Sequence, residues 1–209
     1  MGKYHWSVEY TEQLRQHIVG HHNIIILPHT APDGDALGST LAWAKVLQAA
    51  HPAAKVRVLS PDYIENYISW LPYIDELLIY PRQEEECLKV ISEADLLFHL
   101  DHNQSSRLRY APLVNAVEQS QAPHILIDHH LDPDPSFSLC FSYPESSATC
   151  ELVHALILSL GWEQYITAEV ATLLLTGLIT DTGRFMYSHI SPELFASVSD
   201  LLARGANYP

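Results

Sequence analysis

The chain has 209 residues, of which 47% are hydrophobic and 17% charged. This composition is typical of one folded domain with a real core and excludes an intrinsically disordered chain. Acidic residues outnumber basic ones by 25 to 11, and the net charge of −14 argues against a long basic groove for duplex nucleic acid. No apolar run approaches the roughly 20 residues of a membrane span, and residues 1–10 contain no signal-peptide core. We therefore expect a cytoplasmic protein without a membrane partner.

The three cysteines, Cys87, Cys140 and Cys150, lie far apart and form no CxxC or zinc-knuckle spacing. Such cysteines are more often small core residues than members of a disulfide framework. A reducing compartment fits this usage.

Apolar patterns predict alternating helices and strands through most of the chain. The first is a helix at Val8–Val19, which Gly20 is expected to end. Asn23–Pro28 is a β-branched run without polar alternation, the pattern of a strand buried on both faces. Further strands are predicted at Lys55–Ser60, Leu77–Tyr80, Asp95–Leu100 and Pro123–Ile127, and helices at Ala36–Ala50, Gln83–Glu93 and within Arg107–Gln119. This alternation predicts a doubly wound α/β fold with a mainly parallel sheet flanked by helices.

The C-terminal part is predicted to be mainly helical. Leu131–Pro135 is proline-rich and should be a loop, and Phe137–Ser142 is expected to form a short edge strand. Helices are predicted at Ser147–Leu160, Thr167–Ile179 and Ser191–Arg204, the last with a serine N-cap followed by proline. No internal repeat or linker divides the chain, so one domain is expected over residues 1–209.

Four acidic and histidine clusters each follow an apolar run. They are His29–Asp35, Asp101, Asp128–His130 and Asp181. Parallel strands deliver their carboxyl ends to one edge of a sheet, so residues distant in sequence are expected to converge there. This convergence predicts a two-metal phosphoesterase site.

In the first cluster, His29, Asp33 and Asp35 share one strand-to-helix turn. Gly34 between the two carboxylates is expected to allow a backbone bend that a larger residue would resist. An Asp-Gly-Asp turn by itself is more often a helix cap, but the upstream histidine favours metal binding.

The other clusters supply further candidates. Asp101 alone would be a cap or turn residue, but among the clusters it is the carboxylate that can bridge two ions. Adjacent side chains in extended backbone point to opposite sides, so of His129 and His130 one can bind metal while the other faces substrate. Asp128 either orients one of these rings or is a buried structural residue. Asp181 ends an apolar helix; we prefer a ligand to a simple helix end because it supplies a carboxylate that the neighbouring sites lack.

The candidate ligands are carboxylates with a minority of imidazoles and no thiolate. Such a set suits octahedral Mn²⁺ or Mg²⁺ better than structural Zn²⁺, and the histidines make Mn²⁺ the first choice. Two such ions about 4 Å apart lower the pKa of a bridging water and neutralise charge on a departing oxygen.

These four motifs, taken in order, resemble the DHH phosphoesterase family, which is named after the Asp128-His129-His130 motif. The resemblance covers essentially the whole chain. Three further stretches, Ser69–Pro72, Ser146–Glu151 and Gly177–Phe185, are most similar to the nano-RNase and 3′-phosphoadenosine-5′-phosphate phosphatase branch.

The resemblance implies a role for each site residue. His29, Asp33 and Asp101 would hold one ion, and Asp35, Asp101, His129 and Asp181 the other. His130 would contact the scissile phosphate or assist protonation of the leaving oxygen.

Two positions near the site have alternative interpretations. Arg107 is expected to meet a phosphate or to form a structural ion pair. Many relatives carry a small or hydroxyl-bearing residue directly after the bridging aspartate, where this chain has His102. We expect His102 to face solvent rather than to add a ligand.

Relatives in this branch continue into a smaller C-terminal domain that holds the nucleotide. The sequence ends at the position where the first domain of these relatives ends. We therefore expect a fragment with weak or no hydrolysis of dinucleotides on its own.

The predicted function is metal-dependent hydrolysis of short oligoribonucleotides or of the 3′-phosphate of adenosine 3′,5′-bisphosphate. Within the same fold, inorganic pyrophosphate, polyphosphate and linear dinucleotides are alternative substrates. A noncatalytic metal- or nucleotide-binding module is the alternative of another class, although no expected ligand is lost. Tyr67–Leu71 and Leu152–Leu160 are candidates for exposed apolar surface through which the chain could form a homodimer, unless both stretches belong to the core.

Overall fold

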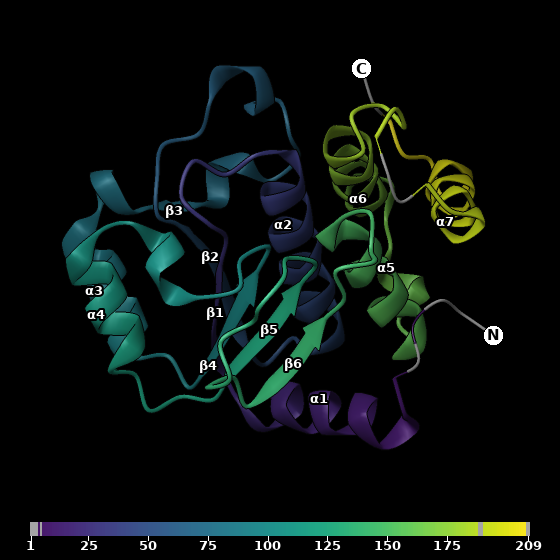
Figure 1. Cartoon of the computed structure of the whole chain (residues 1–209). Coiled ribbons are helices and arrows are strands. Elements are labelled where there is room, and N and C mark those ends of the chain that lie inside the picture. Colours follow the sequence, from purple (N-terminus) through teal and green to yellow (C-terminus); the bar gives the residue numbers. More distant parts are fainter. Residues whose placement is uncertain (1–3, 5, 188–189, 208–209) are drawn as a thin grey trace.

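The computed structural model describes residue 4 and residues 6–187 and 190–207. Its centre is a six-stranded, wholly parallel sheet with the order β3-β2-β1-β4-β5-β6 (Figure 1). The strands are β1 (Asn23–Leu27), β2 (Lys55–Ser60), β3 (Leu78–Ile79), β4 (Leu96–Leu100), β5 (His124–Asp128) and β6 (Leu139–Ser142). The α/β fold, the parallel sheet and the edge position of β6 confirm the predictions.

The central strands owe their unbroken hydrophobic runs to burial on both faces. All five residues of β4 are buried, as are four of the five in β1 and in β5. A parallel sheet needs helices on both faces, and the chain supplies them in two layers.

One helical layer contains α2 (Gly34–Ala50), α5 (Thr149–Ser159) and α6 (Ala168–Asp181), and the other contains α3 (Glu84–Ser92) and α4 (Ala111–Glu118). Each layer closes its own hydrophobic core against the sheet. Figure 1 shows α3 and α4 on one side of the sheet and the C-terminal helices on the other, with α1 (Val8–Gly20) crossing below. The last helix, α7 (Pro192–Ala203), begins at the predicted N-cap, where the Ser191 side chain accepts a hydrogen bond from the Leu194 amide.

Most predicted elements agree with the observed ones to within one or two residues. Leu77–Tyr80 is shorter than expected, with only Leu78–Ile79 paired to β2. Within Arg107–Gln119 the chain first forms a 3-10 helix at Ser105–Leu108 and then α4. All three cysteines are free, and Cys87 and Cys150 are buried as expected. Among the described residues, no helix is both long and apolar enough to cross a membrane.

The strand order reverses between β1 and β4, which lie side by side although other elements separate them in sequence. The chain leaves these two strands in opposite directions, and in open α/β sheets this point forms a crevice at the carboxyl ends of the strands. His29 and Asp33 follow β1, and Asp101 follows β4. The fold therefore brings the first two sequence clusters to one place.

Close packing of α2 on α6 depends on glycine. A Cβ at Gly38 of α2 would collide with the backbone carbonyl oxygen of Leu173 in α6. We expect Gly38→Ala to lower the free energy of unfolding by about 1–3 kcal/mol, because backbone cannot move aside as a flexible side chain can. Urea denaturation monitored by circular dichroism measures this loss.

Gly20→Ala is the matched control. Gly20 is also helical, at the end of α1, but a Cβ there would meet open space. We expect this variant to be as stable as the parent or more stable by up to about 1 kcal/mol. Equal losses in both variants would contradict the packing explanation.

Candidate metal centre

The described residues contain three groups of side chains whose donor atoms lie within 4.8 Å of one another. The groups are His29, Asp33 and Asp101; Asp35, His129 and Asp181; and Asp101, His129 and His130. Asp101 and His129 each occur in two groups. The structure therefore joins all six predicted metal ligands, together with His130, into one continuous cluster.

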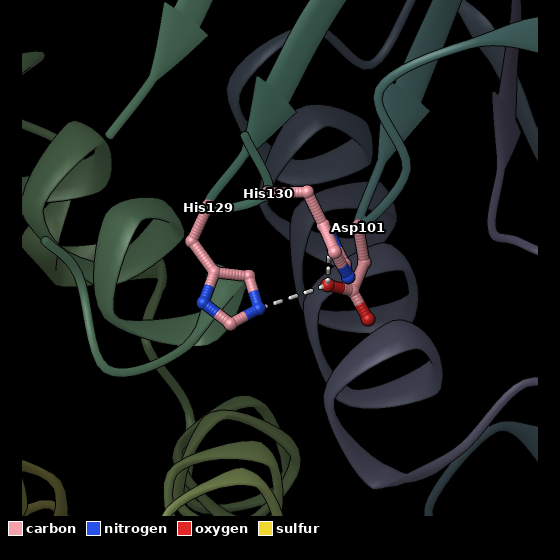
Figure 2. Close-up of side chains that lie close together, drawn as sticks. All are labelled: Asp101, His129 and His130. Atoms are coloured by element: carbon pink, nitrogen blue, oxygen red, sulfur yellow. Dashed lines mark ion pairs between the residues drawn. The ribbon is translucent and has the colours of Figure 1, made fainter. Parts of the chain in front are cut away.

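Asp101 lies at the centre of this cluster. Its Oδ2 is 3.4 Å from His29 Nε2, and its Oδ1 is 3.5 Å from His129 Nε2. Figure 2 shows the rings of His129 and His130 both approaching the Asp101 carboxylate. The backbone of Asp101 adopts a left-handed conformation, with φ of 62°, directly after β4. Such strain is tolerated where the surrounding structure holds it, and here it turns one carboxylate toward two groups of ligands.

Hydrogen bonds at Nδ1 orient the rings of His29 and His129. His29 Nδ1 donates to the carbonyl oxygen of Thr30 at 2.6 Å, and His129 Nδ1 donates to that of Ser146 at 3.3 Å. In the neutral form of each ring, the proton stays on Nδ1 and Nε2 carries the lone pair that can bind a cation. Both Nε2 atoms face carboxylates of the cluster.

The two aspartates at the start of α2 are held by backbone amides. Asp33 is the N-cap of the helix, and its Oδ1 accepts hydrogen bonds from the amides of Asp35 and Ala36. The buried carboxylate of Asp35 accepts the amides of Thr149 and Cys150 at 2.6 and 2.8 Å, at the positive end of α5. Thr149 also donates through Oγ1 to Asp101 at 3.0 Å.

The explanation predicted for Gly34 was wrong. Gly34 is the first residue of α2 and is not among the residues with positive φ, so it does not provide a special bend. A Cβ there would instead collide with the side chain of Thr180 in α6. This close approach brings the end of α6 to the cluster, where Asp181 Oδ2 lies 3.5 Å from His129 Nε2.

The charges in the cluster shift one another's titration. Burial would lower the pKa of His29 and of His129, but the hydrogen bond and negative charge of Asp101 outweigh it and raise these pKa values to about 9 and about 10. Burial favours a neutral Asp101, yet the two histidines hold its pKa below the usual range. Burial and the neighbouring carboxylate of Asp101 raise the pKa of Asp35, and burial with nearby negative charge raises that of Asp181 to about 6.

These shifts predict that Mn²⁺ binding releases protons. In the metal-free chain, His29 and His129 are protonated at neutral pH, whereas a ligand must be a neutral imidazole. The apparent affinity for Mn²⁺ should therefore rise with pH between about pH 6 and about pH 9. Calorimetry in buffers of different ionisation enthalpy measures the released protons, and a pH-independent affinity would contradict the assignment.

The same shifts predict how the metal-free chain responds to alkali. The folded-state pKa of His29 lies above its ordinary value. The ion pair of His29 with Asp101 therefore contributes its full stabilisation at pH values below that ordinary pKa. This contribution is lost as the pH rises through about 9. Thermal unfolding across that range should show a declining melting temperature in the absence of metal.

His129 and His130 do not point to opposite sides, contrary to expectation. Strand β5 ends at Asp128, so the two histidines lie beyond its extended backbone. Both rings approach Asp101, with His130 Nδ1 3.8 Å from Asp101 Oδ1 (Figure 2). His130 Nδ1 also lies 2.7 Å from Oδ1 of the buried Asp128. Asp128 thus orients the His130 ring, one of the two roles predicted for it.

His102 is fully buried, so the prediction that it faces solvent was wrong. Its Nδ1 lies 3.0 Å from the carbonyl oxygen of Leu100, and its Nε2 lies 3.0 Å from Nδ1 of His99. Nε2 of His99 in turn lies 3.1 Å from Nδ1 of His124. Burial lowers the pKa of His102 to about 4, so this ring is neutral. His102, His99 and His124 thus form a row of contacting rings.

Arg107 lies in the 3-10 helix that follows the Asp101 loop, and its carbonyl oxygen accepts the amide of Thr30 at 2.9 Å. Among the described residues, the ion pair beside this loop belongs instead to Arg109, whose Nη1 is 3.0 Å from Asp62 Oδ2. The same Asp62 oxygen accepts a hydrogen bond from Thr30 Oγ1 at 2.7 Å. The backbone of Arg107 and the Asp62–Arg109 pair thus brace the loop that carries His29.

Sequence reasoning missed Asp62, Arg109 and the amides of Thr149 and Cys150. The stretch Ser146–Glu151 was noticed as a family-like pattern, but backbone donors leave no residue-type signal. Asp62 and Arg109 lie in unremarkable loops, and only the fold brings them to Thr30.

The residues present fit divalent cations that prefer oxygen and imidazole. None of the three groups found in the described part of the chain contains a cysteine. Carboxylate-rich sets with a minority of imidazole suit Mn²⁺ or Mg²⁺. The cluster is thus able to bind metal.

Comparison with known proteins agrees with this geometry. The sequence profile described as "DHH family, N-terminal domain" matches residues 23–178. A bifunctional oligoribonuclease and PAP phosphatase NrnA of Thermus thermophilus is 32% identical over 185 residues, which are 87% of this chain and 50% of that protein. The cyclic-di-AMP phosphodiesterase GdpP of Bacillus subtilis is 28% identical over 201 residues, or 93% of this chain and 30% of its own length.

A crystal structure of an exopolyphosphatase-related protein from Bacteroides fragilis superimposes with a TM-score of 0.91 at 33% identity. The match covers 96% of this chain and 58% of that one. The chain thus spans about half the length of the NrnA relative and somewhat more of the structural one. With a profile match over most of its residues and the four motifs gathered at one sheet edge, the chain belongs to the DHH family.

Proposed function

We propose that this chain carries the catalytic site of a metal-dependent phosphoesterase that hydrolyses short oligoribonucleotides, the 3′-phosphate of adenosine 3′,5′-bisphosphate, or both. The observation that carries the proposal is the arrangement around Asp101, whose two oxygens face different histidines in two adjoining groups of ligands. The substrate class is taken from the NrnA relative, whose name describes both activities.

In this proposal, His29, Asp33 and Asp101 hold one cation, and Asp35, Asp101, His129 and Asp181 hold the other. Mn²⁺ is the first choice and Mg²⁺ the alternative. When bound, the two cations would supply an acidified water and offset negative charge on the departing oxygen.

The protein's own groups position the site and move a proton. The amides of Thr149 and Cys150 fix the Asp35 carboxylate before any ligand arrives. His130, held at Nδ1 by Asp128, is proposed to contact the scissile phosphate and to protonate the leaving oxygen. Arg107 is proposed to meet a phosphate further along the substrate.

Inorganic pyrophosphatase or exopolyphosphatase activity is the second candidate, favoured by the similarity to the exopolyphosphatase-related protein. A noncatalytic binding module has no comparable support, because every proposed ligand is present in the cluster.

A substrate panel tests the proposal. The purified chain is incubated with Mn²⁺ and a diribonucleotide, adenosine 3′,5′-bisphosphate or pyrophosphate, and mononucleotide and phosphate are quantified. We expect slow, metal-dependent hydrolysis of one or both nucleotides, abolished by chelation. Hydrolysis of pyrophosphate alone would favour the second candidate, and turnover that survives chelation would contradict the proposal.

A further inference from the structure

A cavity of about 540 Å³ adjoins the metal centre. Asp33, a member of the His29–Asp33–Asp101 group, lines it, as does Gly34. Its volume falls within the roughly 300–1,000 Å³ of small-molecule sites. A molecule with its phosphate at the metal centre can therefore extend directly into this space.

Large exposed side chains from two separate segments meet at the cavity. Tyr67 comes from the connection between β2 and β3, and Met186 and Tyr187 from the connection between α6 and α7. They are 64%, 81% and 67% exposed. Figure 1 shows the two connections at the same end of the molecule. Apolar surface gathered at one cavity, rather than scattered singly, is typical of a binding site.

The backbone of the second segment is arranged to present these side chains. Gly183, Arg184 and Phe185 have φ of 56°, 61° and 63°, a left-handed turn that includes two residues other than glycine. The Phe185 ring packs on Phe195 of α7, with ring centroids 5.4 Å apart, and anchors the turn. The residues directly before and after Phe185, Arg184 and Met186, are exposed and line the cavity.

The Tyr187 ring is seated on the turn. A Cβ at Gly183 would collide with three atoms of that ring, so the ring lies directly against the glycine backbone. Its position is therefore set by packing, while most of its surface stays exposed toward solvent.

The chemistry of this wall matches a nucleotide better than an inorganic phosphate chain. Aromatic faces stack on any base, and a guanidinium adds attraction for a base plane or a phosphate. Pyrophosphate has no π face, so it cannot stack on either tyrosine ring. In a chain with a net charge of −14, Arg184 is moreover a cation placed beside a carboxylate-rich site.

We propose that this cavity is a nucleobase subsite in which Tyr67 and Tyr187 stack on the base of a nucleoside phosphate bound at the metal centre. This inference rests on the proposed function and narrows it, because it assigns selection of nucleotides over inorganic phosphates to residues of this chain.

The test compares two probes that differ only in the base. Adenosine 5′-monophosphate and ribose 5-phosphate are titrated into the Mn²⁺-loaded chain by calorimetry. We expect the mononucleotide to bind more tightly. Tyr67→Leu and Tyr187→Leu should each weaken its binding by about tenfold, the scale of one lost base–aromatic stack, and leave ribose 5-phosphate unchanged.

Matched variants separate stacking from other effects. Tyr67→Phe and Tyr187→Phe keep the ring and should retain the preference for the mononucleotide. Tyr63→Leu is the control, because Tyr63 is 52% exposed in the same connection but does not line the cavity. Equal affinity of the parent chain for both probes, or equal losses for both probes in the leucine variants, would overturn the subsite.

The same samples distinguish this inference from the proposed function. Hydrolysis of a diribonucleotide without any preference for the mononucleotide over ribose 5-phosphate would overturn the subsite and leave the phosphoesterase proposal intact. A tyrosine-dependent preference without hydrolysis of any phosphoester would support the subsite and contradict the phosphoesterase proposal.

Discussion

Replacing Asp101 with asparagine is expected to abolish the binding of two metal ions and to lower phosphoesterase activity by at least about 100-fold. Asp101 places one oxygen near each of two histidines, so no other carboxylate of the cluster can take its position. Loss of a group that merely supports a ligand typically costs about 10–100-fold in metal affinity or activity, and loss of a shared ligand should cost no less. Mn²⁺ calorimetry and the diribonucleotide assay measure the two effects.

Asp95→Asn is the matched control, because Asp95 and Asp101 flank the same strand, β4, at its two ends. The Asp95 carboxylate accepts the amides of His22 and Asn23 at the edge of the sheet away from the cluster. We expect Asp95→Asn to retain both ions. Two-ion binding that persists in Asp101→Asn would refute the bridging role.

Alanine at His129 and at His130 should give different defects, although the residues are neighbours. His129 Nε2 faces Asp35, Asp101 and Asp181, so His129→Ala should lose one ion. His130 is held by Asp128 at the rim of the cluster. His130→Ala should keep two ions and lose about 100-fold or more in kcat, the usual contribution of a general acid.

Asp128→Asn provides an independent check on this difference. If Asp128 acts through the His130 ring, the variant should lower kcat and shift its pH profile with two ions still bound. Loss of an ion in His130→Ala, or unchanged kcat in both variants, would contradict the roles assigned to this pair.

The sequence predicted the fold well because the dominant signals are local. Short unbroken β-branched runs such as Ile24–Leu27 are typical of strands buried on both faces, and their alternation with helices favours parallel strands. The strand order, with β1 beside β4, depends on long-range pairing that no local pattern contains. The sheet edge that would gather the clusters was nevertheless predictable from the rule for parallel strands.

Side-chain directions were predicted less well, for identifiable reasons. The alternation expected for His129 and His130 fails because β5 ends at Asp128, before both histidines. His102 is buried because its ring pairs with His99 of β4, which in turn pairs with His124 of the neighbouring strand β5. Gly34 is needed for a helix that comes much later in the chain, so its role is invisible to any local argument.

The cavity beside Asp33 was also beyond the sequence patterns. Tyr67 belongs to a stretch that combines exposed and buried residues, since Ile68 and Leu71 are in the core. Only the fold brings Tyr67 to Tyr187. In the interpretation advanced above, these rings add base selection to a centre that handles only the phosphate.

The number of Mn²⁺ ions bound per chain is the measurement that tests the two-metal centre most directly. Titration calorimetry on the purified chain at neutral pH, checked by metal analysis after dialysis, gives this number. The arrangement around Asp101 predicts two ions per chain, both displaced by chelator and both lost in Asp101→Asn. A chain that binds no ion, or a single ion that persists in Asp101→Asn, would contradict it.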